Sequence, residues 1–595
     1  MFENRFQKDY SMLVLVAIFY RVLFERRIIM ADETKFSGAD LLINALQVNG
    51  LKNIYGVVGI PVTDFARLAQ IKGMKYYGFR REDAAVDAAA AAGFLTGKPG
   101  LALTVSAPGF LNGIAALAQA TENCFPLIMI SGSSDRHIID LNRGDYEGMD
   151  QYNIAKPFCK AAYRVDRAQD MGLVVARAIR TAVSGRPGGV YLDLPAATIT
   201  DMATKEEAGI YKLVDPAPKQ YPSDEAIERA VELLKNAKRP LILLGKGAAY
   251  ARSEDEVKEL VEETGIPFLP MSMAKGILPD THKSSAVAAR SLSLNNADVV
   301  FLIGARLNWM LSNGESPLFA QDVKFIQADI DATELDSNRK ISAPLQGDIK
   351  SVLDKLVPAV KKAGVHVPQD WLDRIEQDVE KNDAKFSARI EASFTAPKFG
   401  YYGTIEPINQ LFQKHPDTYL VSEGANTLDI GRDLINMNLP RHRIDTGTWG
   451  VMGIGLGYAI AAAVETGKPV IALDGDSAFG FDGMEMSTIC RYKLPITVVV
   501  VNNGGIYNGI DQVVPNQPGP TQLNDNAHYE YLSKAFGGNS YFVTNHDEMV
   551  KALNEAYESG KPSLINAQIA PTMGKESGHI GNLNPKLDLN PKDNL

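Results

Sequence analysis

The chain has 595 residues, of which 45% are hydrophobic and 22% charged, and its formal net charge is −10. This length exceeds what one compact core supports and predicts three or four domains. The acidic balance argues against a nucleic-acid-binding protein, which needs a basic face. The three cysteines lie far apart and form no CxxC pair, which argues against zinc and disulfide scaffolds and favours free, at least half-buried thiols.

The first 29 residues differ in character from the rest of the chain. Residues 12–24 are apolar, but they contain Arg21 and are shorter than the roughly 20 residues of a membrane span. No small-residue cleavage site comes after them, as it would after a signal peptide. Met30 opens a sequence typical of a natural start, with Ser37 or Asp40 as a helix cap. We therefore interpret residues 1–29 as a non-functional extension and expect no membrane association.

Residues 30–214 alternate short apolar stretches with alanine-rich helical stretches. This alternation predicts a parallel sheet that is covered on both faces. The predicted strands are residues 54–58, 76–79, 101–105, 127–130 and 190–192, and the predicted helices are residues 83–94 and 171–184.

Two further blocks repeat the alternation after a break at Asp215-Pro216-Ala217-Pro218. Residues 366–403 between them are predicted to be a partly helical linker, and residues 570–595 a flap or tail. The sequence thus predicts an α/β fold of three doubly wound parallel-sheet domains. The predicted strands are residues 240–244, 299–303 and 324–328 in the second block (215–365), and 419–422, 470–473, 497–501 and 563–568 in the third (404–569).

The strongest motif lies in the third block, at the ends of two predicted strands. The first strand runs into Asp474-Gly475-Asp476-Ser477, and the next ends in Asn502-Asn503-Gly504-Gly505. Ligands of doubly wound sheets bind at the carboxyl ends of strands, so these groups should meet. Carboxylate, amide and carbonyl oxygens suit Mg²⁺, and glycines let the backbone approach phosphates. Residues 479–494 are predicted to be helical, with the N-terminus toward a diphosphate.

This arrangement resembles the cofactor motif of thiamine-diphosphate-dependent enzymes, although either half alone would indicate only a turn. The resemblance implies that Asp476, Asn503 and Gly505 bind Mg²⁺, and that Met452 supports the bent cofactor. A dinucleotide-binding fingerprint fails at residues 453–457, because its third glycine would fall at Tyr458. The other cofactor-binding positions that the resemblance implies are Glu82, Asn426, Gly475, Ser477, Ala478, Ile506 and Tyr507.

Glu82 lies where an aromatic stretch meets an alanine-rich helix, in the sequence Arg80-Arg81-Glu82. An ordinary charge at a helix N-terminus would explain Glu82 if it stood alone. The family, however, places at such a junction the buried glutamate that hydrogen-bonds the pyrimidine ring of the cofactor and activates it. In that family the two motifs come from neighbouring subunits, so the resemblance implies an obligate homodimer, assembled further into a homotetramer.

Within this family the chain resembles the oxalyl-CoA decarboxylases over residues 36–582. Matching stretches include YGVVGIPVTDFARL (55–68), RGDYEGMDQYNIAKPFCK (143–160) and TGTWGVMGIGLGYA (446–459). The resemblance implies a cytoplasmic enzyme that decarboxylates oxalyl-CoA to formyl-CoA and CO₂ in oxalate breakdown. It implies that Tyr146, Glu147, Tyr507 and Ser577 join Glu82 in catalysis, and that Ile60, Tyr146 and Ser577 contact the substrate. The tail departs from the family at His579, where the family has Arg, which weakens the pairing of this position with an anion.

The second block presents polar residues at three strand ends. An acid in such a position suits ribose hydroxyls, and Lys and Arg suit phosphates. Oxalyl-CoA decarboxylases bind ADP here as an activator, whereas a vestigial fold element with surface charges is the alternative. The positions implied for ADP are Arg186, Lys246, Arg306, Asp329 and Ile330.

Two other functions stay open at the level of sequence. A 2-hydroxyacyl-CoA lyase or an acetolactate-synthase-like enzyme would share the cofactor motif. A non-catalytic sensor of CoA or nucleotides could share the fold, but intact Glu82, Asp476 and Asn503 argue against it.

Overall fold

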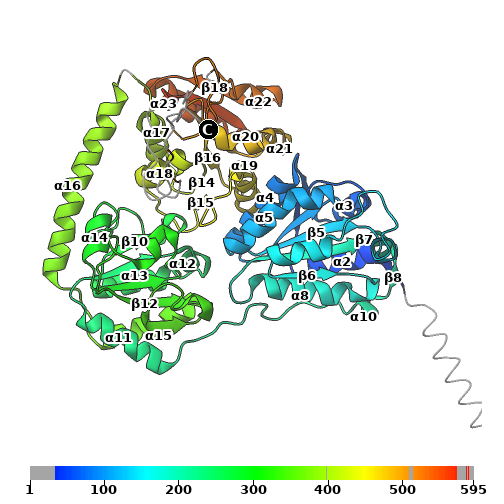
Figure 1. Cartoon of the computed structure of the whole chain (residues 1–595), viewed down its shortest axis with the longest axis horizontal. Helices are drawn as coiled ribbons and strands as arrows, with labels where there is room; N and C mark the ends of the chain where they lie inside the picture. The colour runs from blue at the N-terminus through cyan, green and yellow to red at the C-terminus, as the bar shows by residue number, and fades with distance from the viewer. Residues whose placement is uncertain are drawn as a thin grey trace, which may run out of the picture.

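The computed structural model describes residues 34–396, 398–507, 514–524, 526–571, 585 and 587. It contains three parallel sheets with helices packed around them, which confirms the predicted fold class (Figure 1). The extension at residues 1–29 and the tail residues Ser577 and His579 lie outside the described residues. None of the described helices is both long and apolar enough to span a bilayer.

The N-terminal sheet has six parallel strands in the order β3-β2-β4-β5-β7-β6. The Ser37 hydroxyl accepts the N–H of Asp40 and the Asp40 carboxylate accepts the N–H of Ser37, so both predicted cap residues take part in a capping box at the first helix. The strands are β2 (Asn53–Gly56), β3 (Lys75–Gly78), β4 (Gly100–Thr104), β5 (Leu127–Ser133), β6 (Ala161–Arg164) and β7 (Gly189–Pro195), with β1 (Phe36–Ser37) and β8 (Met202–Ala203) paired separately. The helices are α2 (Gly38–Val48), α3 (Thr63–Ile71), α4 (Glu82–Thr96), α5 (Pro108–Glu122), α6 (Arg136–Ile139), α7 (Gln151–Ala155), α8 (Met171–Val183), α9 (Ala196–Thr200) and α10 (Lys205–Ala208).

The middle sheet has five parallel strands in the order β10-β9-β11-β12-β13. Its strands are β9 (Pro240–Leu244), β10 (Phe268–Pro270), β11 (Val299–Ile303), β12 (Lys324–Asp329) and β13 (Ile341–Gln346). Its helices are α11 (Asp224–Asn236), α12 (Lys246–Tyr250), α13 (Glu254–Thr264), α14 (Arg290–Asn296) and α15 (Ile349–Lys362).

The C-terminal sheet has six parallel strands in the order β15-β14-β16-β17-β19-β18. Its strands are β14 (Tyr419–Ser422), β15 (Arg443–Asp445), β16 (Val470–Gly475), β17 (Ile496–Asn502), β18 (Asn539–Val543) and β19 (Ser563–Gln568). Its helices are α17 (Tyr401–Lys414), α18 (Ala425–Leu434), α19 (Gly455–Thr466), α20 (Asp476–Asp482), α21 (Met486–Arg491), α22 (Glu530–Ala535) and α23 (His546–Ser559), with the 3₁₀ turn η7 (Gly483–Glu485) between α20 and α21.

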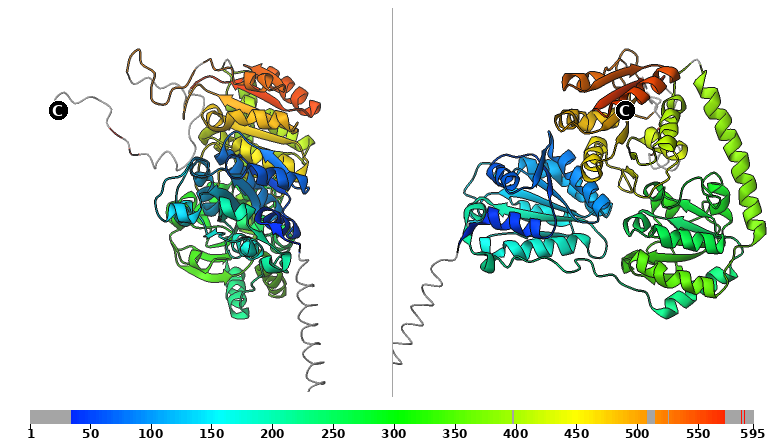
Figure 2. Two further views of the ribbon diagram at one scale, coloured as in Figure 1. Left: turned by 90° about the vertical axis from the view of Figure 1, so that its right-hand side faces the viewer. Right: turned by 180° about the vertical axis from the view of Figure 1, so that it is seen from behind.

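One long helix, α16 (Gln369–Phe394), occupies most of the predicted linker and runs along the outer edge between the middle and C-terminal domains (Figure 2). Of its 26 residues only Trp371 and Ile375 are buried, so most of the helix surface is in contact with solvent. The Trp371 indole donates a hydrogen bond to the carbonyl of Pro240 at the start of β9, which anchors the N-terminal end of α16 to the middle sheet.

The N-terminal and C-terminal domains pack through two alanine-rich helices, α4 and α19, which lie side by side between the sheets (Figure 1). Small side chains allow close approach: a Cβ on Gly457 would lie 2.7 Å from the carbonyl oxygen of Ala84. The Tyr458 hydroxyl accepts a hydrogen bond from Gln119, which satisfies a fully buried polar group at this contact. The packing fixes α4, and therefore Glu82 at its first turn, relative to the C-terminal domain.

Replacing Gly93 with Ala is expected to destabilise the N-terminal domain by about 1–3 kcal/mol, because the packing around Gly93 leaves no space for an added methyl group. Gly93 faces the segment before β5, and a Cβ there would lie 1.9 Å from the carbonyl oxygen of Pro126. The midpoint of thermal unfolding should fall. Gly480→Ala is the matched control, since a Cβ at Gly480 meets nothing within 4 Å. An unchanged midpoint for Gly93→Ala would contradict this packing.

Candidate active site

Asp476 lies where β16 ends beside β17, two parallel neighbours in the C-terminal sheet. Its side chain is buried, and its Oδ2 accepts the backbone N–H groups of Gly504 (2.9 Å) and Gly505 (3.1 Å). Burial raises the pKa of Asp476 to about 6. The two strand ends that the sequence predicted to meet are therefore in direct contact.

Two amide side chains approach the same strand end and donate to one carbonyl. Asn503 and Asn426 donate to the carbonyl oxygen of Tyr507 at 2.9 Å and 2.8 Å. The Asn503 Oδ1 accepts from the N–H of Gly505 at 3.2 Å. The Asn426 Oδ1 is buried and has no hydrogen-bond partner within the described ranges. Tyr507 has a φ of 55°, a left-handed conformation that is uncommon for a non-glycine residue.

The segment after Asp476 is helical as far as Arg491, which confirms the helical segment predicted at residues 479–494 except for its last three residues. It forms α20, η7 and α21 in succession. Gly480 and Gly483 lie inside it, and glycine lowers the stability of a continuous helix. Within the first turn, the N–H of Ser477 donates to Asp476 Oδ1 at 2.8 Å, and Ala478 is buried.

Met452 lies in an irregular segment that a buried carboxylate holds in place. Glu423, at the end of β14, accepts the N–H groups of Gly453, Ile454 (2.8 Å) and Gly455 (2.6 Å). Glu423 is fully buried, and burial raises its pKa to about 7. Glu423 is not among the residues predicted from the sequence, although its position at a third strand end of the same sheet was a usable signal.

Glu82 forms the start of α4 and is 8% exposed. Its Oε2 accepts a hydrogen bond from the amide of Asn112 on α5 at 3.0 Å. This contact ties Glu82 to its own domain, whereas Asp476 belongs to the C-terminal sheet. The predicted catalytic glutamate is thus at a helix start and nearly buried, as expected from its sequence position.

Two of the three predicted substrate residues, Ile60 and Tyr146, lie on exposed loops of the N-terminal domain. Ile60 is 67% exposed and Tyr146 is 70% exposed. Glu147 has a φ of 55°, and its Oε2 is buried with no hydrogen-bond partner among the residues described. Such strain is often kept where a loop has a function. In the single chain the side chains of Ile60 and Tyr146 are therefore open to solvent.

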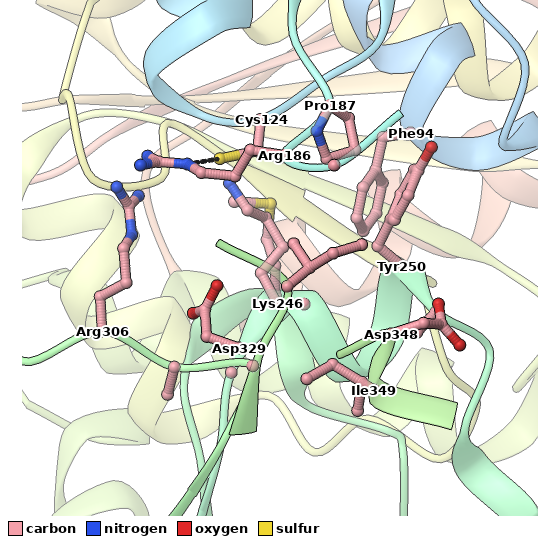
Figure 3. Close-up of a pocket in the computed structure, with 18 of the residues that line it drawn as sticks. Phe94, Cys124, Arg186, Pro187, Lys246, Tyr250, Arg306, Asp329, Asp348 and Ile349 are labelled. Atoms are coloured by element: carbon pink, nitrogen blue, oxygen red, sulfur yellow. Dashed lines mark hydrogen bonds between the residues drawn. The ribbon is translucent and has the colours of Figure 1, made fainter. Parts of the chain in front are cut away.

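A cavity of about 400 Å³ lies at the carboxyl ends of β9, β11 and β12 and contains every residue predicted for ADP (Figure 3). Arg186, Lys246 and Arg306 give it a cationic side, and Phe94 and Tyr250 line the opposite side. Several lining residues were not predicted from the sequence: some come from the other two domains or from the segment at residues 215–218, and others from the middle domain itself. These are Phe94, Cys124, Pro216, Tyr250, Asp348, Ile349 and Thr448.

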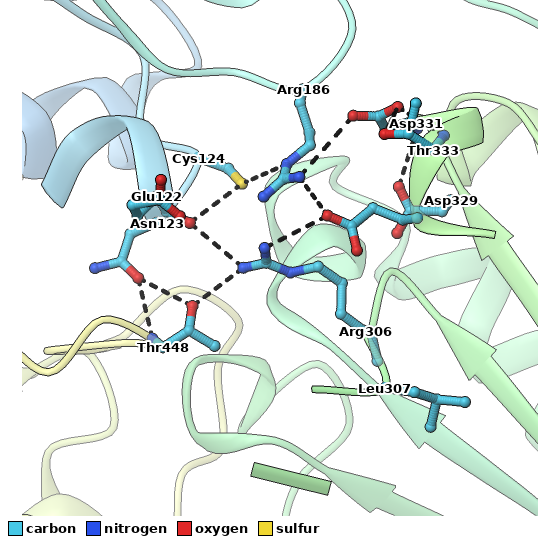
Figure 4. A network of polar contacts seen from close by, with 12 residues as sticks. Glu122, Asn123, Cys124, Arg186, Arg306, Leu307, Asp329, Asp331, Thr333 and Thr448 are labelled. Carbon is cyan, nitrogen blue, oxygen red and sulfur yellow. Dashed lines mark hydrogen bonds and ion pairs between the residues drawn. The ribbon is translucent and has the colours of Figure 1, made fainter. Parts of the chain in front are cut away.

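Arg186 and Arg306 share one carboxylate at the rim of this cavity (Figure 4). Both guanidinium groups pair with Glu334, and Arg306 also donates to Thr448 Oγ1 of the C-terminal domain at 3.1 Å. Burial lowers the pKa of Lys246 to about 8 and raises that of Asp329 to about 6. The three cysteines, one of which lies here, are free and half-buried, as predicted.

In the parts of the chain that the structure describes, no group of three or more His, Cys, Asp and Glu side chains is placed to hold a metal ion. A metal ion can also be held by one carboxylate, one amide oxygen and one backbone carbonyl oxygen. Asp476, Asn503 and Gly505 form such a set, with the buried Asn426 Oδ1 nearby as a free acceptor. The donor set fits a hard cation that bridges to phosphate oxygens.

Comparison with known proteins places the chain in a family. Three family models match it: "Thiamine pyrophosphate enzyme, N-terminal TPP binding domain" at residues 36–154, "central domain" at 227–356 and "C-terminal TPP binding domain" at 424–567. Thiamine pyrophosphate is another name for thiamine diphosphate.

Full-length relatives agree with the family models. Oxalyl-CoA decarboxylase of Escherichia coli (strain K12) is 52% identical over 562 residues, which cover 94% of this chain and 99% of the relative. The 2-hydroxyacyl-CoA lyase of Oryza sativa subsp. japonica is 43% identical, covering 92% of this chain and 98% of the relative. The human 2-hydroxyacyl-CoA lyase 1 is 40% identical, covering 91% and 96%. The chain therefore belongs to the thiamine pyrophosphate enzymes, in the group that contains oxalyl-CoA decarboxylase and the 2-hydroxyacyl-CoA lyases.

Proposed function

We propose that this protein is a cytoplasmic enzyme that decarboxylates oxalyl-CoA to formyl-CoA and CO₂ in oxalate breakdown, with thiamine diphosphate and Mg²⁺ as cofactors. The observation that carries the choice of reaction is the 52% identity to an oxalyl-CoA decarboxylase over 94% of the chain, against 43% to a lyase. The contact between Asp476 and the Gly504–Gly505 backbone supports the cofactor site.

Asp476, Asn503 and the carbonyl of Gly505 would hold Mg²⁺, and the residues around them would hold the diphosphate. Desolvation disfavours the charged form of Asp476, and a bound divalent cation offsets that cost. Bound thiamine diphosphate supplies the carbon nucleophile and the electron sink that loss of CO₂ requires. Glu82 would hold a proton at its carboxyl group toward the pyrimidine ring. Tyr146, Glu147, Tyr507 and Ser577 would orient the oxalyl group, with Ile60 at the pocket wall.

Two copies of the chain would complete each active site. Glu82 lies in the N-terminal domain and Asp476 in the C-terminal domain, and the apolar side chains around both half-sites are exposed in the single chain. Burial of such side chains against a second copy would be favourable. We propose an obligate homodimer, assembled further into a homotetramer. The exposed apolar residues are Ile60, Tyr146, Trp449, Met452, Phe481 and Tyr507.

The reaction is tested by offering one enzyme preparation three substrates. With thiamine diphosphate and Mg²⁺ present, oxalyl-CoA should give formyl-CoA and CO₂, whereas a 2-hydroxyacyl-CoA and pyruvate should be turned over far more slowly. Preferential cleavage of the 2-hydroxyacyl-CoA to formyl-CoA and an aldehyde would assign the protein to the lyases. Turnover of pyruvate alone would overturn both assignments.

We further propose that ADP binds in the 400 Å³ cavity and activates the enzyme. The cavity combines the requirements of a nucleoside diphosphate: Arg186, Lys246 and Arg306 for phosphates, and Asp329 for ribose hydroxyls. Calorimetry with ADP should show one site per chain. No heat of binding and no stimulation of dialysed enzyme would remove this proposal.

The affinity for ADP is expected to fall roughly tenfold between pH 7 and pH 9, because one charge-assisted hydrogen bond is lost. Lys246 has a pKa of about 8 through burial, so it is cationic at pH 7 and largely neutral at pH 9. Lys246→Met should bind weakly at both pH values and lose the pH dependence.

Lys160→Met is the matched control for this prediction. Burial also lowers the Lys160 pKa to about 8, but its ammonium group donates to the carbonyl groups of Ser184 and Arg186 and does not line the cavity. A pH dependence that survives in Lys246→Met and disappears in Lys160→Met would contradict the assignment.

A further inference from the structure

The entry into α4 has no cap of its own. Arg81 occupies the N-cap position with an extended backbone, and its side chain makes no capping hydrogen bond. Its guanidinium group instead pairs with Asp83 at 2.7 Å. Helix starts usually rely on Ser, Thr, Asp or Asn to satisfy free backbone N–H groups. The backbone directly before Glu82 makes its hydrogen bonds to another domain.

The acceptor of these hydrogen bonds is Glu485, a residue of the C-terminal domain. Its Oε1 accepts the backbone N–H groups of Arg80 (2.9 Å) and Arg81 (3.0 Å), and its Oε2 accepts the hydroxyl of Thr488 (2.6 Å). Glu485 is 0% exposed. A fully buried carboxylate is costly unless it is well hydrogen-bonded, so these contacts explain why an acid is tolerated there.

Neighbours of Glu485 hold the preceding strand end. The Tyr492 hydroxyl accepts the N–H of Gly78 at 2.8 Å, and the guanidinium group of Arg491 donates to the carbonyl of Gly78. Residues 485, 488 and 492 have the i, i+3, i+7 spacing of one helix face, from the end of η7 to the residue that caps α21. The C-terminal domain therefore hydrogen-bonds the backbone that connects β3 to α4, at Gly78, Arg80 and Arg81.

We propose that Glu485 is a positioning residue for the cofactor: it fixes the backbone of Arg80 and Arg81 so that the Glu82 carboxyl group points where the pyrimidine ring requires it. This inference rests on the role proposed for Glu82. On one side Glu82 is oriented by Asn112, and on the other by the backbone that Glu485 holds. Because Glu485 lies nine residues after Asp476, one helical segment begins at the proposed metal carboxylate and also holds the backbone next to Glu82.

Hydrogen–deuterium exchange of the holoenzyme tests the anchoring directly. Glu485→Ala should speed exchange of the Arg80 and Arg81 amides by roughly tenfold or more, because their acceptor is gone. Glu530→Ala is the matched control, since Glu530 is also a buried acid of the C-terminal domain but bonds to Asn566 and His528. Unchanged exchange in Glu485→Ala, or equal acceleration in Glu530→Ala, would overturn the proposal.

The consequence for the cofactor is measured on the cofactor itself. Exchange of its C2 proton and the circular-dichroism band of its imino tautomer report the contact with Glu82 without substrate. Glu485→Ala should slow C2 exchange by roughly 10–100-fold, as expected for a misplacement of about 1 Å, with cofactor affinity largely kept. Glu485→Gln should restore it, because the amide oxygen still accepts both N–H groups. Tyr492→Phe should also slow C2 exchange, but by less than Glu485→Ala. It is the variant to measure if Glu485→Ala fails to fold.

C2 exchange in the Glu82 and Glu485 variants separates the role of Glu82 from the positioning role of Glu485. If Glu82→Gln leaves C2 exchange unchanged, the role of Glu82 is wrong. If Glu82→Gln stops C2 exchange while Glu485→Ala and Tyr492→Phe do not slow it, only the positioning role of Glu485 is wrong. If Glu485→Gln is as slow as Glu485→Ala, the requirement is for charge and not for an acceptor at this point, which also contradicts the proposal.

Discussion

Glu82→Gln is expected to lower kcat for oxalyl-CoA by about 10²–10⁴-fold, the range found when a positioned proton-transfer group is removed. The variant should still bind thiamine diphosphate and Mg²⁺, because Glu82 lies in the N-terminal domain, away from the Asp476 end of the C-terminal sheet. Glutamine keeps the shape and can still accept a hydrogen bond from Asn112, but it has no carboxyl proton to share with the ring nitrogen. Single-turnover kinetics together with cofactor titration measure the two effects separately.

Asp83→Asn is the control for this substitution. Asp83 is the next residue of the same helix turn, and it pairs with Arg81 at the surface. Its loss should leave kcat nearly unchanged. Full activity in Glu82→Gln, or equal losses in the two variants, would show that Glu82 does not activate the cofactor.

Asp476→Ala is expected to weaken the binding of thiamine diphosphate by about 100-fold or more, since loss of even an outer partner of a metal ligand typically costs 10–100-fold. The loss should be seen as a higher cofactor concentration needed for half-maximal activity, and high Mg²⁺ should not fully restore it. The buried carboxylate also accepts two backbone N–H groups, so local order at Gly504 and Gly505 should fall as well.

A surface acid of the same domain provides the comparison. Asp547 lies in the first turn of α23 and is exposed, so Asp547→Ala should bind the cofactor like the wild type. Wild-type cofactor affinity in Asp476→Ala would remove this residue from the metal site.

The interior strands were predictable from the sequence, and most of the edge strands were not. Strands β9, β11, β14 and β19 begin and end at the predicted residues, and each has a neighbour on both sides. Interior strands of parallel sheets are covered on both faces and show as short apolar runs. The five missed strands of the three large sheets are all edges, which are shorter or more polar: β6, β10, β13, β15 and β18.

The active site was predictable where it depends on strand ends. Asp476 and the Gly504–Gly505 backbone meet because parallel neighbours end at the same edge. Glu485 was missed because its partners are backbone N–H groups of an irregular segment, which side-chain periodicity does not encode, whereas Glu423 was missed although it directly follows a predicted strand. The helical segment predicted after Asp476 was confirmed as far as Arg491, although a 3₁₀ turn that begins at Gly483 divides it. The assignment of Ser577 stays a prediction.

The most direct measurement is formation of formyl-CoA from oxalyl-CoA by enzyme stripped of cofactor and metal. We predict no product from the stripped protein, none with thiamine diphosphate or Mg²⁺ alone, and full activity when both are returned. Product formation without thiamine diphosphate, or none with both present and the fold intact, would contradict the central claim.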